Sequence, residues 1–245
     1  MKLILALSFL FVFGFTNNVL AENTDPTTAE DIQFGDMVIR LDPNIAGAVR
    51  HSAEEPYQDW EMGMRYPRHH VLTFERYVLT GALPLRRQIR VYLREDDQDV
   101  VFEGTRIPER LEAMIERAGS GLRSRDVSLI PPQMAGMLLF SHPERIEGEN
   151  LIGVRFLTYL GQDMSWPVEN RLLYVFHGFT ADRSRLITAW LTVQRPALPL
   201  DADAAPAWDA MRAKYNELQK EIGSLSTMAF TPELDRLDRM ILSIR

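Results

Sequence analysis

Cysteine is absent from this 245-residue chain. Its absence excludes disulfide bonds, thiolate metal sites, a cysteine nucleophile and a lipid anchor on an N-terminal lipoprotein cysteine. Stability must therefore come from packing alone. Lysine is also scarce, because only Lys2, Lys214 and Lys220 occur among the 27 basic residues. The resulting arginine bias fits anion binding or ion-pair networks through the planar guanidinium group, and a genomic codon bias explains it equally well.

An excess of positive charge is missing too. The chain carries 27 basic and 34 acidic residues and a formal net charge of −7. Nucleic acid is therefore not an expected partner. With 46% hydrophobic and 25% charged residues, the chain can bury a substantial core, and the composition is unlike that of collagen-like, low-complexity or disordered proteins.

Long apolar runs are absent apart from one at the start, Leu3 to Phe15, which follows Lys2. The run is short for a membrane span, and Val19 and Ala21 suit the −3 and −1 positions of a cleavage site. We therefore expect a signal peptide over residues 1–21 and an exported, periplasmic or extracellular protein without a lipid anchor or a membrane span after cleavage. The polar residues 22–31 predict a flexible lead-in, and residues 32–245 predict a single α+β domain.

β-rich segments separated by turn residues dominate the middle of the chain. The most evident pair is a hairpin with a polar connection at residues 181–184. Both faces of its first arm are apolar, which predicts a central hairpin covered on both sides. Residues 52–68 predict an irregular loop with buried aromatic anchors. The expected strands are 34–41, 71–79, 88–93, 137–141, 151–160, 171–180 and 185–194, of which 71–79 and 88–93 should pair.

Helical periodicity indicates one helix over residues 108–118 and a C-terminal helical pair over about residues 203–245. In the pair, a second helix should start with Thr231 as N-cap and Pro232 at the first helical position. The expected architecture is an antiparallel sheet flanked by helices. The apolar stripe of the first helix of the pair comprises Trp208, Met211, Tyr215, Leu218, Ile222 and Leu225.

Several strings resemble a family of secreted proteins and lipoproteins from cyanobacteria, Chloroflexi and other bacteria that has no assigned reaction. They are Gly153-Val154-Arg155-Phe156-Leu157-Thr158, Leu173-Tyr174-Val175-Phe176-His177-Gly178-Phe179-Thr180-Ala181-Asp182, Ala197-Leu198-Pro199, and Phe230-Thr231-Pro232-Glu233-Leu234 with Leu237-Asp238. The hairpin more distantly resembles the Mog1/PsbP-like fold, which implies an α/β/α sandwich and no particular activity. Departures from the family pattern are the missing lipid-attachment cysteine, His177 in place of Gln, and Arg183 in place of a turn glycine.

Catalytic candidates are few. His177, Asp182 and Ser184 lie close together along the hairpin and suggest a hydrolase-like site, but a triad requires a base within hydrogen-bond reach of the serine and an oxyanion hole. The alternative makes Asp182 and Ser184 turn formers and His177 a polar group on a covered strand. No nucleophile elbow, phosphate loop or metal-ligand spacing occurs in the sequence, so neither a metal site nor a cofactor is expected. The adjacent His69 and His70 should point to opposite faces of a strand.

An anion-binding face is a further candidate. Arg86, Arg90 and Arg94 alternate on one side of the expected strand 88–93 and could line one surface. A solvated strand face gives the same pattern, and Glu75 on the neighbouring strand could neutralise part of it. The sequence thus favours a non-catalytic binding or accessory protein of the bacterial cell envelope, with an unknown protein or small-molecule partner. The alternative is a hydrolase-like enzyme that uses His177 and Asp182.

Overall fold

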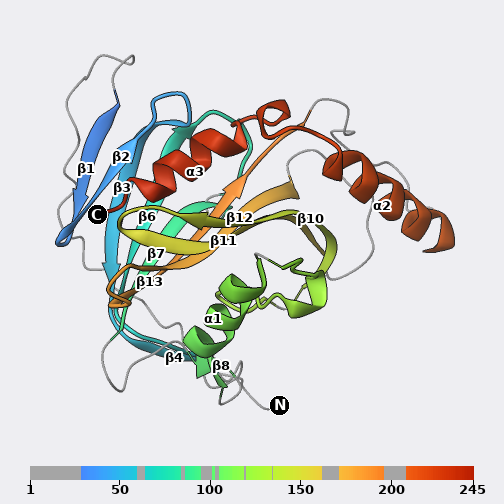
Figure 1. Ribbon diagram of the computed structural model, residues 1–245. Coiled ribbons are helices and arrows are strands. Elements are labelled where there is room, and N and C mark those ends of the chain that lie inside the picture. Colours follow the sequence, from blue (N-terminus) through green and yellow to red (C-terminus); the bar gives the residue numbers. More distant parts are fainter. Residues whose placement is uncertain are drawn as a thin grey trace, which may run out of the picture.

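A large antiparallel sheet with helices on both faces dominates the computed structural model (Figure 1). The strands are β1 (Glu30–Phe34), β2 (Met37–Leu41), β3 (Ala46–Glu54), β4 (Tyr57–Asp59), β5 (Met64–Tyr66), β6 (His69–Tyr77), β7 (Arg87–Leu93), β8 (Val101–Phe102), β9 (Thr105–Arg106), β10 (Gly136–Glu147), β11 (Leu151–Gly161), β12 (Leu172–Thr180) and β13 (Arg185–Thr192). The α-helices are α1 (Ile107–Ala118), α2 (Trp208–Gly223) and α3 (Leu234–Leu242). The structure describes residues 29–59, 64–83, 86–94, 101–102, 105–118, 120–133, 135–161, 171–195 and 208–245.

Seven strands form the main sheet in the order β10-β11-β12-β13-β7-β6-β3, and every neighbouring pair is antiparallel. The hairpin β12–β13 lies inside the sheet, and both its strands are buried almost throughout. The sequence predicts this position correctly from the two apolar faces of the first arm. The predicted pairing of strands 71–79 and 88–93 is confirmed as β6 with β7.

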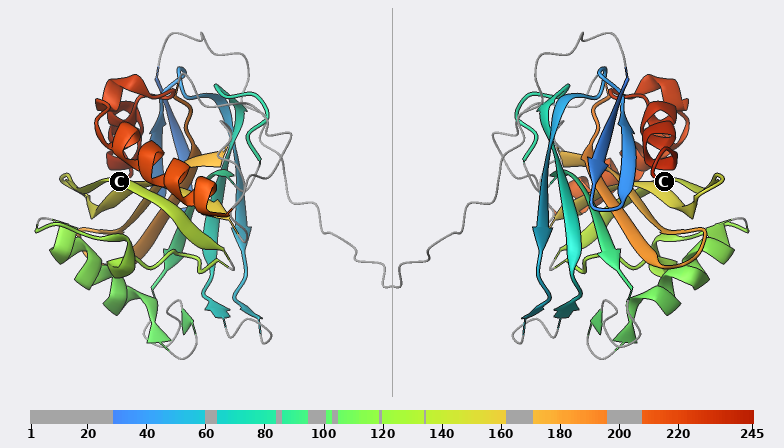
Figure 2. Two further views of the ribbon diagram at one scale, coloured as in Figure 1. Left: turned by 90° about the vertical axis from the view of Figure 1, so that its right-hand side faces the viewer. Right: turned by 90° about the vertical axis from the view of Figure 1, so that its left-hand side faces the viewer.

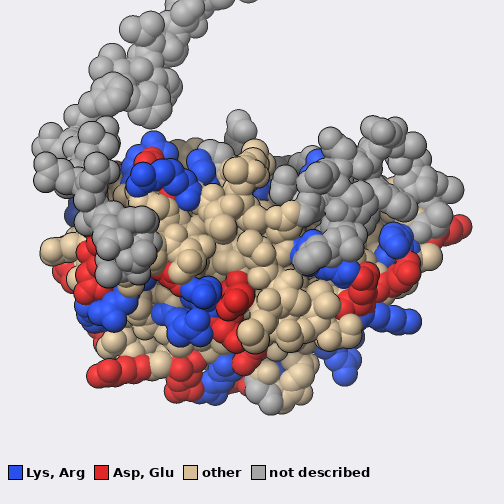
Figure 3. Space-filling view, turned by 90° about the horizontal axis from the view of Figure 1, so that it is seen from above, with Lys and Arg blue, Asp and Glu red and all other residues tan. Residues whose placement is uncertain are grey.

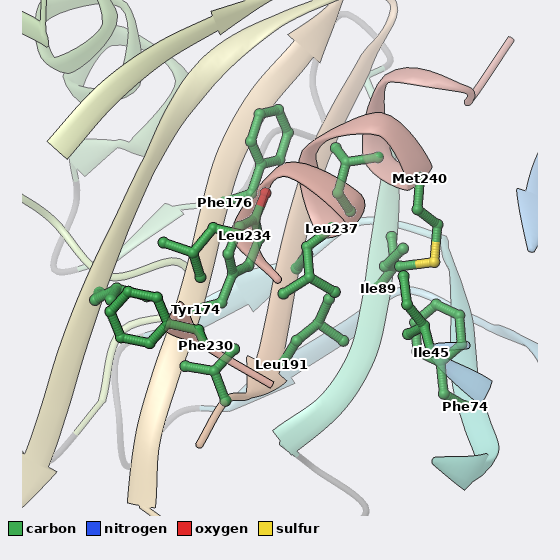
Figure 4. Packing of buried hydrophobic residues seen from close by; sticks show 14 of the residues in the cluster. Ile45, Phe74, Ile89, Tyr174, Phe176, Leu191, Phe230, Leu234, Leu237 and Met240 are labelled. Atoms are coloured by element: carbon green, nitrogen blue, oxygen red, sulfur yellow. The ribbon is translucent and has the colours of Figure 1, made fainter. Parts of the chain in front are cut away.

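Two separate hydrophobic cores fill the two faces of the sheet (Figure 2). On one face, the β1–β2 hairpin and helices α2 and α3 cover the sheet. Figure 4 shows the apolar side chains of α3, among them Leu234, Leu237 and Met240, above Tyr174 and Leu191 of the sheet. On the other face, α1 and the segment that follows it pack against β10, β11 and β12. The molecule is therefore a mixed α+β protein.

A pair of glycines gives the central hairpin its close packing. Gly153 and Gly178 lie directly opposite each other on β11 and β12. A Cβ atom at either position would fall 2.4–2.5 Å from the ring of Phe176. The Phe176 ring therefore occupies the space that two side chains would otherwise need, and any larger residue at either glycine would displace it.

Three elements differ from the prediction because local backbone chemistry overrides the hydrophobic pattern. Residues 34–41 form a hairpin rather than one strand, since Gly35 has a φ of 58° and turns the chain between β1 and β2. The expected lead-in also ends early, because β1 begins at Glu30. Helix α3 begins after Glu233 instead of Thr231, because the Thr231 amide and carbonyl pair with Gln194 at 2.8 Å each.

The expected loop over residues 52–68 is largely strand. Within this stretch lie the end of β3 and the strands β4 and β5, and Tyr57 on β4 is exposed. β4 and β5 join β8 and β9 in a four-stranded sheet beyond the end of the main sheet (Figure 1). The aromatic anchor expected in this stretch, Trp60, lies outside the described residues, as do the signal peptide, the residues 22–28 and the side chain of Trp208.

The surface carries mixed charge. On the side shown in Figure 3, basic and acidic side chains lie interspersed among uncharged ones. Among the described residues, no helix is long and apolar enough to cross a membrane. Both predicted C-terminal helices are present. Helix α2 packs against β10 of the main sheet, and α3 packs against β2.

Candidate functional site

The sheet face that α1 packs against has an apolar half and a polar half. Under α1, strands β11, β12 and β13 present apolar side chains such as Phe156, Val175 and Trp190. On β7, β6 and β3 the same face is polar, because the strand alternation brings charged and hydroxyl side chains to it. These residues are Gln88, Arg90 and Tyr92 on β7, His69, Thr73 and Glu75 on β6, and Arg50 and Glu54 on β3.

Four polar residues form a central polar cluster where the two halves meet. Arg90 and Tyr92 lie on β7, Thr188 lies opposite Arg90 on β13, and His177 lies opposite Thr188 on β12. Tyr92, Thr188 and His177 are 0% exposed, and Arg90 is half-buried. The register of three central strands therefore holds the cluster in place.

Three side-chain atoms of this cluster are buried without a hydrogen bond of good geometry among the described residues: Tyr92 Oη, Thr188 Oγ1 and His177 Nδ1. Tyr92 makes weaker contacts with Arg90 and Thr188, and His177 with the backbone of Phe176. His69 Nε2 is in the same condition, and it lies 3.3 Å from Glu54 Oε2 and interacts with that carboxylate. A buried polar group without a well-formed hydrogen bond costs up to about 1–3 kcal/mol of stability, so the cluster is a place where a ligand or ordered water would be stabilising.

The hydrogen bond made by His177 fixes its tautomer. Its Nε2 accepts a bond from the backbone N–H of Ile130 at 3.2 Å. Burial lowers the pKa of His177 to about 3, an effect that the Phe176 backbone opposes, so the imidazole is neutral near pH 7. In a neutral ring with Nε2 as the acceptor, the proton resides on Nδ1. His177 therefore contributes an N–H donor to the cluster.

The remaining members of the cluster are donors as well. Burial raises the pKa of Tyr92, against the opposing effect of Arg90, so its hydroxyl keeps its proton. Arg90 donates a long bond of 3.4 Å to Gln88, contacts the Tyr92 hydroxyl and interacts electrostatically with Glu54. The cluster thus combines one cation with an imidazole N–H and two hydroxyl groups, a donor set that matches the oxygens of a carboxylate or phosphate.

A stacked pair connects the cluster to the edge of the sheet. The His69 ring stacks on Tyr92 with 4.8 Å between centroids, and its Nδ1 lies 3.0 Å from the carbonyl oxygen of Pro67. Glu54 lies opposite His69 on the edge strand β3, and its hydrogen bond with His69 lowers the pKa of this carboxyl group. Polar groups therefore extend from exposed Glu54 to the buried centre.

The segment after α1 covers the cluster. Ile130 in this segment uses both backbone groups on the sheet, because its N–H donates to His177 and its carbonyl accepts from Trp190 Nε1 at 2.8 Å. Sequence reasoning missed this arrangement. The cluster could have been found from a histidine, a threonine and an arginine that lie opposite one another on three neighbouring strands of the sheet. That observation requires the register of the strands to be known.

The structure does not bring His177, Asp182 and Ser184 together. The Asp182 carboxylate lies in the exposed β12–β13 turn and accepts bonds from Thr180 Oγ1 at 2.6 Å, Ser184 N at 3.0 Å and Ser184 Oγ at 2.8 Å. These bonds lower the pKa of Asp182 to about 2. Asp182 and Ser184 are therefore turn residues, in line with the alternative to a hydrolase-like site that the sequence suggests.

Arg183 in the same turn has a φ of 63°, in the left-handed region where glycine is most easily accommodated. The Arg183 guanidinium lies over the Phe179 ring at 4.9 Å from its centroid.

The three arginines of the expected anion face have different surroundings. Arg86 precedes β7, and its pKa is lowered by burial and by nearby Arg171. Arg94 donates to the carbonyl of Arg183 at 3.0 Å and lies over the Phe179 ring. Only Arg90 belongs to the central polar cluster. Glu75 lies on the same face and pairs with Arg50 at 3.4 Å.

A second polar cluster lies on the opposite face, beneath α3. Arg155 is 1% exposed and pairs with Glu144 and, at 3.4 Å, with Asp238 of α3. Tyr174 donates to Asp238 at 2.7 Å. Burial raises the pKa of Asp238 to about 6. Every charged group here has a partner from another element, which is typical of a structural ion-pair network.

Comparison with known protein families, curated proteins and solved structures returned no match. The site must therefore be interpreted from its own geometry. Within the described residues, no group of three or more His, Asp or Glu side chains converges.

Proposed function

We propose that this protein is a non-catalytic binding protein whose central polar cluster takes a small ligand with a carboxylate or phosphate group. The observation that carries the proposal is the burial of three polar atoms that lack well-formed hydrogen bonds, in the cluster that contains the Arg90 guanidinium. A bound oxyanion would accept hydrogen bonds from His177 Nδ1, the two hydroxyl groups and Arg90. Charge-assisted bonds of this kind are about twice as strong as neutral ones.

The neutral state of His177 supports binding over hydrolysis. A general base is most effective with a pKa near the working pH, whereas the pKa of His177 is about 3. Its Nε2 is already engaged by Ile130. The imidazole is therefore suited to donating a hydrogen bond from Nδ1 and poorly suited to taking a proton from a nucleophile.

We also propose that the protein is exported and acts in the cell envelope, on the strength of the N-terminal signal pattern in residues 1–21. The fold is proposed to be a Mog1/PsbP-like sandwich, a proposal supported by the antiparallel sheet with helices on both faces. An envelope protein with this site would bind an anionic metabolite or headgroup without chemical change.

Binding of simple anions to wild type and to Arg90→Gln tests the proposal. We expect phosphate, acetate or citrate to raise the melting temperature of wild type saturably, with glucose and choline as uncharged and cationic controls. Arg90→Gln should weaken anion binding at least tenfold, because it removes the cation. Arg50→Gln is the matched control on the same face, since Arg50 pairs with Glu75 outside the cluster. Equal losses in the two variants, or no anion effect on wild type, would contradict the proposal.

Removal of the hydroxyl groups separates binding from packing. In the ligand-free protein, Tyr92→Phe and Thr188→Val should leave stability unchanged or raise it by up to about 1 kcal/mol, because each removes a buried hydroxyl group that makes only weak contacts. The same variants should bind the anion more weakly. If both lose stability and keep binding, the hydroxyl groups serve the fold, with ordered water as their partner.

A further inference from the structure

Two histidines meet on the sheet face opposite the central polar cluster. His51 on β3 and His70 on β6 lie with the Nε2 of His51 2.9 Å from the Nδ1 of His70, and their ring centroids are 5.0 Å apart. His51 is exposed and His70 is half-buried. The edge strand β3 and its neighbour β6 thus bring two imidazole nitrogens together.

The two facing nitrogens are joined by a hydrogen bond between the rings. One proton is shared in the contact between the two nitrogens, since one must donate and the other accept. Transfer of that proton to the other nitrogen of the donor ring frees both facing lone pairs without a change in net charge.

We propose that His51 and His70 form a Cu²⁺-binding site, with water as the remaining ligands. At a metal–nitrogen distance of about 2.0 Å, nitrogens 2.9 Å apart subtend an angle near 90°, as in the cis positions of a tetragonal site. A tetrahedral Zn²⁺ site would require a separation of about 3.3 Å. The geometry and the general order of divalent affinities both favour copper over zinc.

The β1–β2 turn holds the His70 ring in this position. A Cβ atom on Gly35 would fall 2.8 Å from His70 Nε2, so only glycine admits the ring this close. The centroid of the Phe34 ring lies 6.1 Å from that of His51 and 6.0 Å from that of His70. Asp36 in the same turn pairs with Arg185 at 3.0 Å.

Titration of tag-free, full-length protein with Cu²⁺ tests the site. We expect one equivalent to bind with an electron paramagnetic resonance spectrum showing coupling to two nitrogens, and Zn²⁺ to bind at least tenfold more weakly. His51→Gln and His70→Gln should each weaken Cu²⁺ binding tenfold or more. His142→Gln, which changes a histidine bonded to the carbonyl of Leu225, is the control and should bind as wild type does.

A positioning variant tests the geometry without removing a ligand. Gly35→Ala should displace the His70 ring and weaken Cu²⁺ binding, with both histidines still present. Copper binding that survives His51→Gln and His70→Gln would overturn the proposal, as would a wild-type spectrum without nitrogen coupling. These outcomes are independent of anion binding at the central polar cluster, which lies on the other face.

Discussion

His177 shows how one residue can be both predictable and misleading. In sequence it is a histidine near an aspartate and a serine, a pattern that suggests acid–base chemistry. In the structure it is fully buried, its Nε2 is bonded to Ile130, and Asp182 belongs to a turn. Its surroundings decide its chemistry, because burial makes the charged form costly and leaves a neutral donor.

His177→Gln should preserve the fold and make the protein less sensitive to acid. A glutamine side chain can accept the Ile130 bond, so we expect a stability change within about 1–2 kcal/mol at pH 8. The pKa of His177 in the folded state, about 3, lies below its usual 6.5. Its contribution is therefore fully present above pH 6.5 and is lost as the pH falls toward 3.

Urea denaturation of both proteins at pH 8 and pH 4 measures this effect. Between these values the wild type should lose about 3 kcal/mol more than His177→Gln, since each pKa unit corresponds to about 1.4 kcal/mol. Parallel losses would mean that His177 is already accessible to protons in the folded state.

Residue identities alone could not predict the central polar cluster. Arg90 was recognisable as a candidate from its alternation, but Tyr92 and Thr188 resemble ordinary strand residues. Their meeting with His177 depends on pairing between strands that are about 90 residues apart in sequence. Register of this kind follows from the whole packed sheet, and a local pattern does not contain it.

At the scale of elements, the strands and helices were largely predictable because their periodicity is strong. Helix α1 and the hairpin β12–β13 lie within a few residues of their predicted bounds. The exceptions are the β1–β2 turn, the strands β3, β4, β5, β8 and β9, the second half of β10 and the start of α3. A positive φ at Gly35 decides the first, and the pairing of Thr231 with Gln194, far away in sequence, decides the last. A local hydrophobic pattern carries little information about either.

Helix α3 depends on a carboxylate that is poorly solvated. Asp238 lies between Arg155 and Tyr174, and burial raises its pKa to about 6. A folded pKa above the usual 3.8 means that this group contributes most stability below pH 3.8 and that the contribution is lost as the pH rises through 6. Its effect on stability therefore runs opposite to that of His177.

Asp238→Asn should remove this dependence, because an amide resembles the protonated acid and can still accept the Tyr174 bond. Relative to wild type, we expect the variant to gain about 2 kcal/mol of stability between pH 4 and pH 8. Asp235→Asn, on the same helix, is the control, and urea denaturation at the two pH values is the measurement. If the free energies of unfolding of Asp238→Asn and wild type differ by the same amount at pH 4 and pH 8, Arg155 keeps Asp238 ionised at both pH values.

On the scale of the whole molecule, the two faces of the sheet serve different purposes. One face is closed by the β1–β2 hairpin and two helices over a continuous apolar core, and its buried ion pairs connect α3 to the sheet. The other face is only half apolar, and buried polar groups without well-formed hydrogen bonds lie where its two halves meet. A protein that needed only stability would gain by replacing those groups, so their retention favours a binding role for this face.

Export is the prediction that concerns the chain as a whole. Cleavage after Ala21 would remove the apolar run and leave every described strand intact, because β1 begins at Glu30. We expect the protein recovered from the envelope or medium of a bacterial host to begin at Glu22 on N-terminal sequencing. Replacement of Ala21 by a large residue such as Trp should block processing, since the −1 position requires a small side chain. Recovery of the cytoplasmic, unprocessed chain from cells that express the wild-type sequence would contradict the proposed location while leaving the anion and copper experiments unaffected.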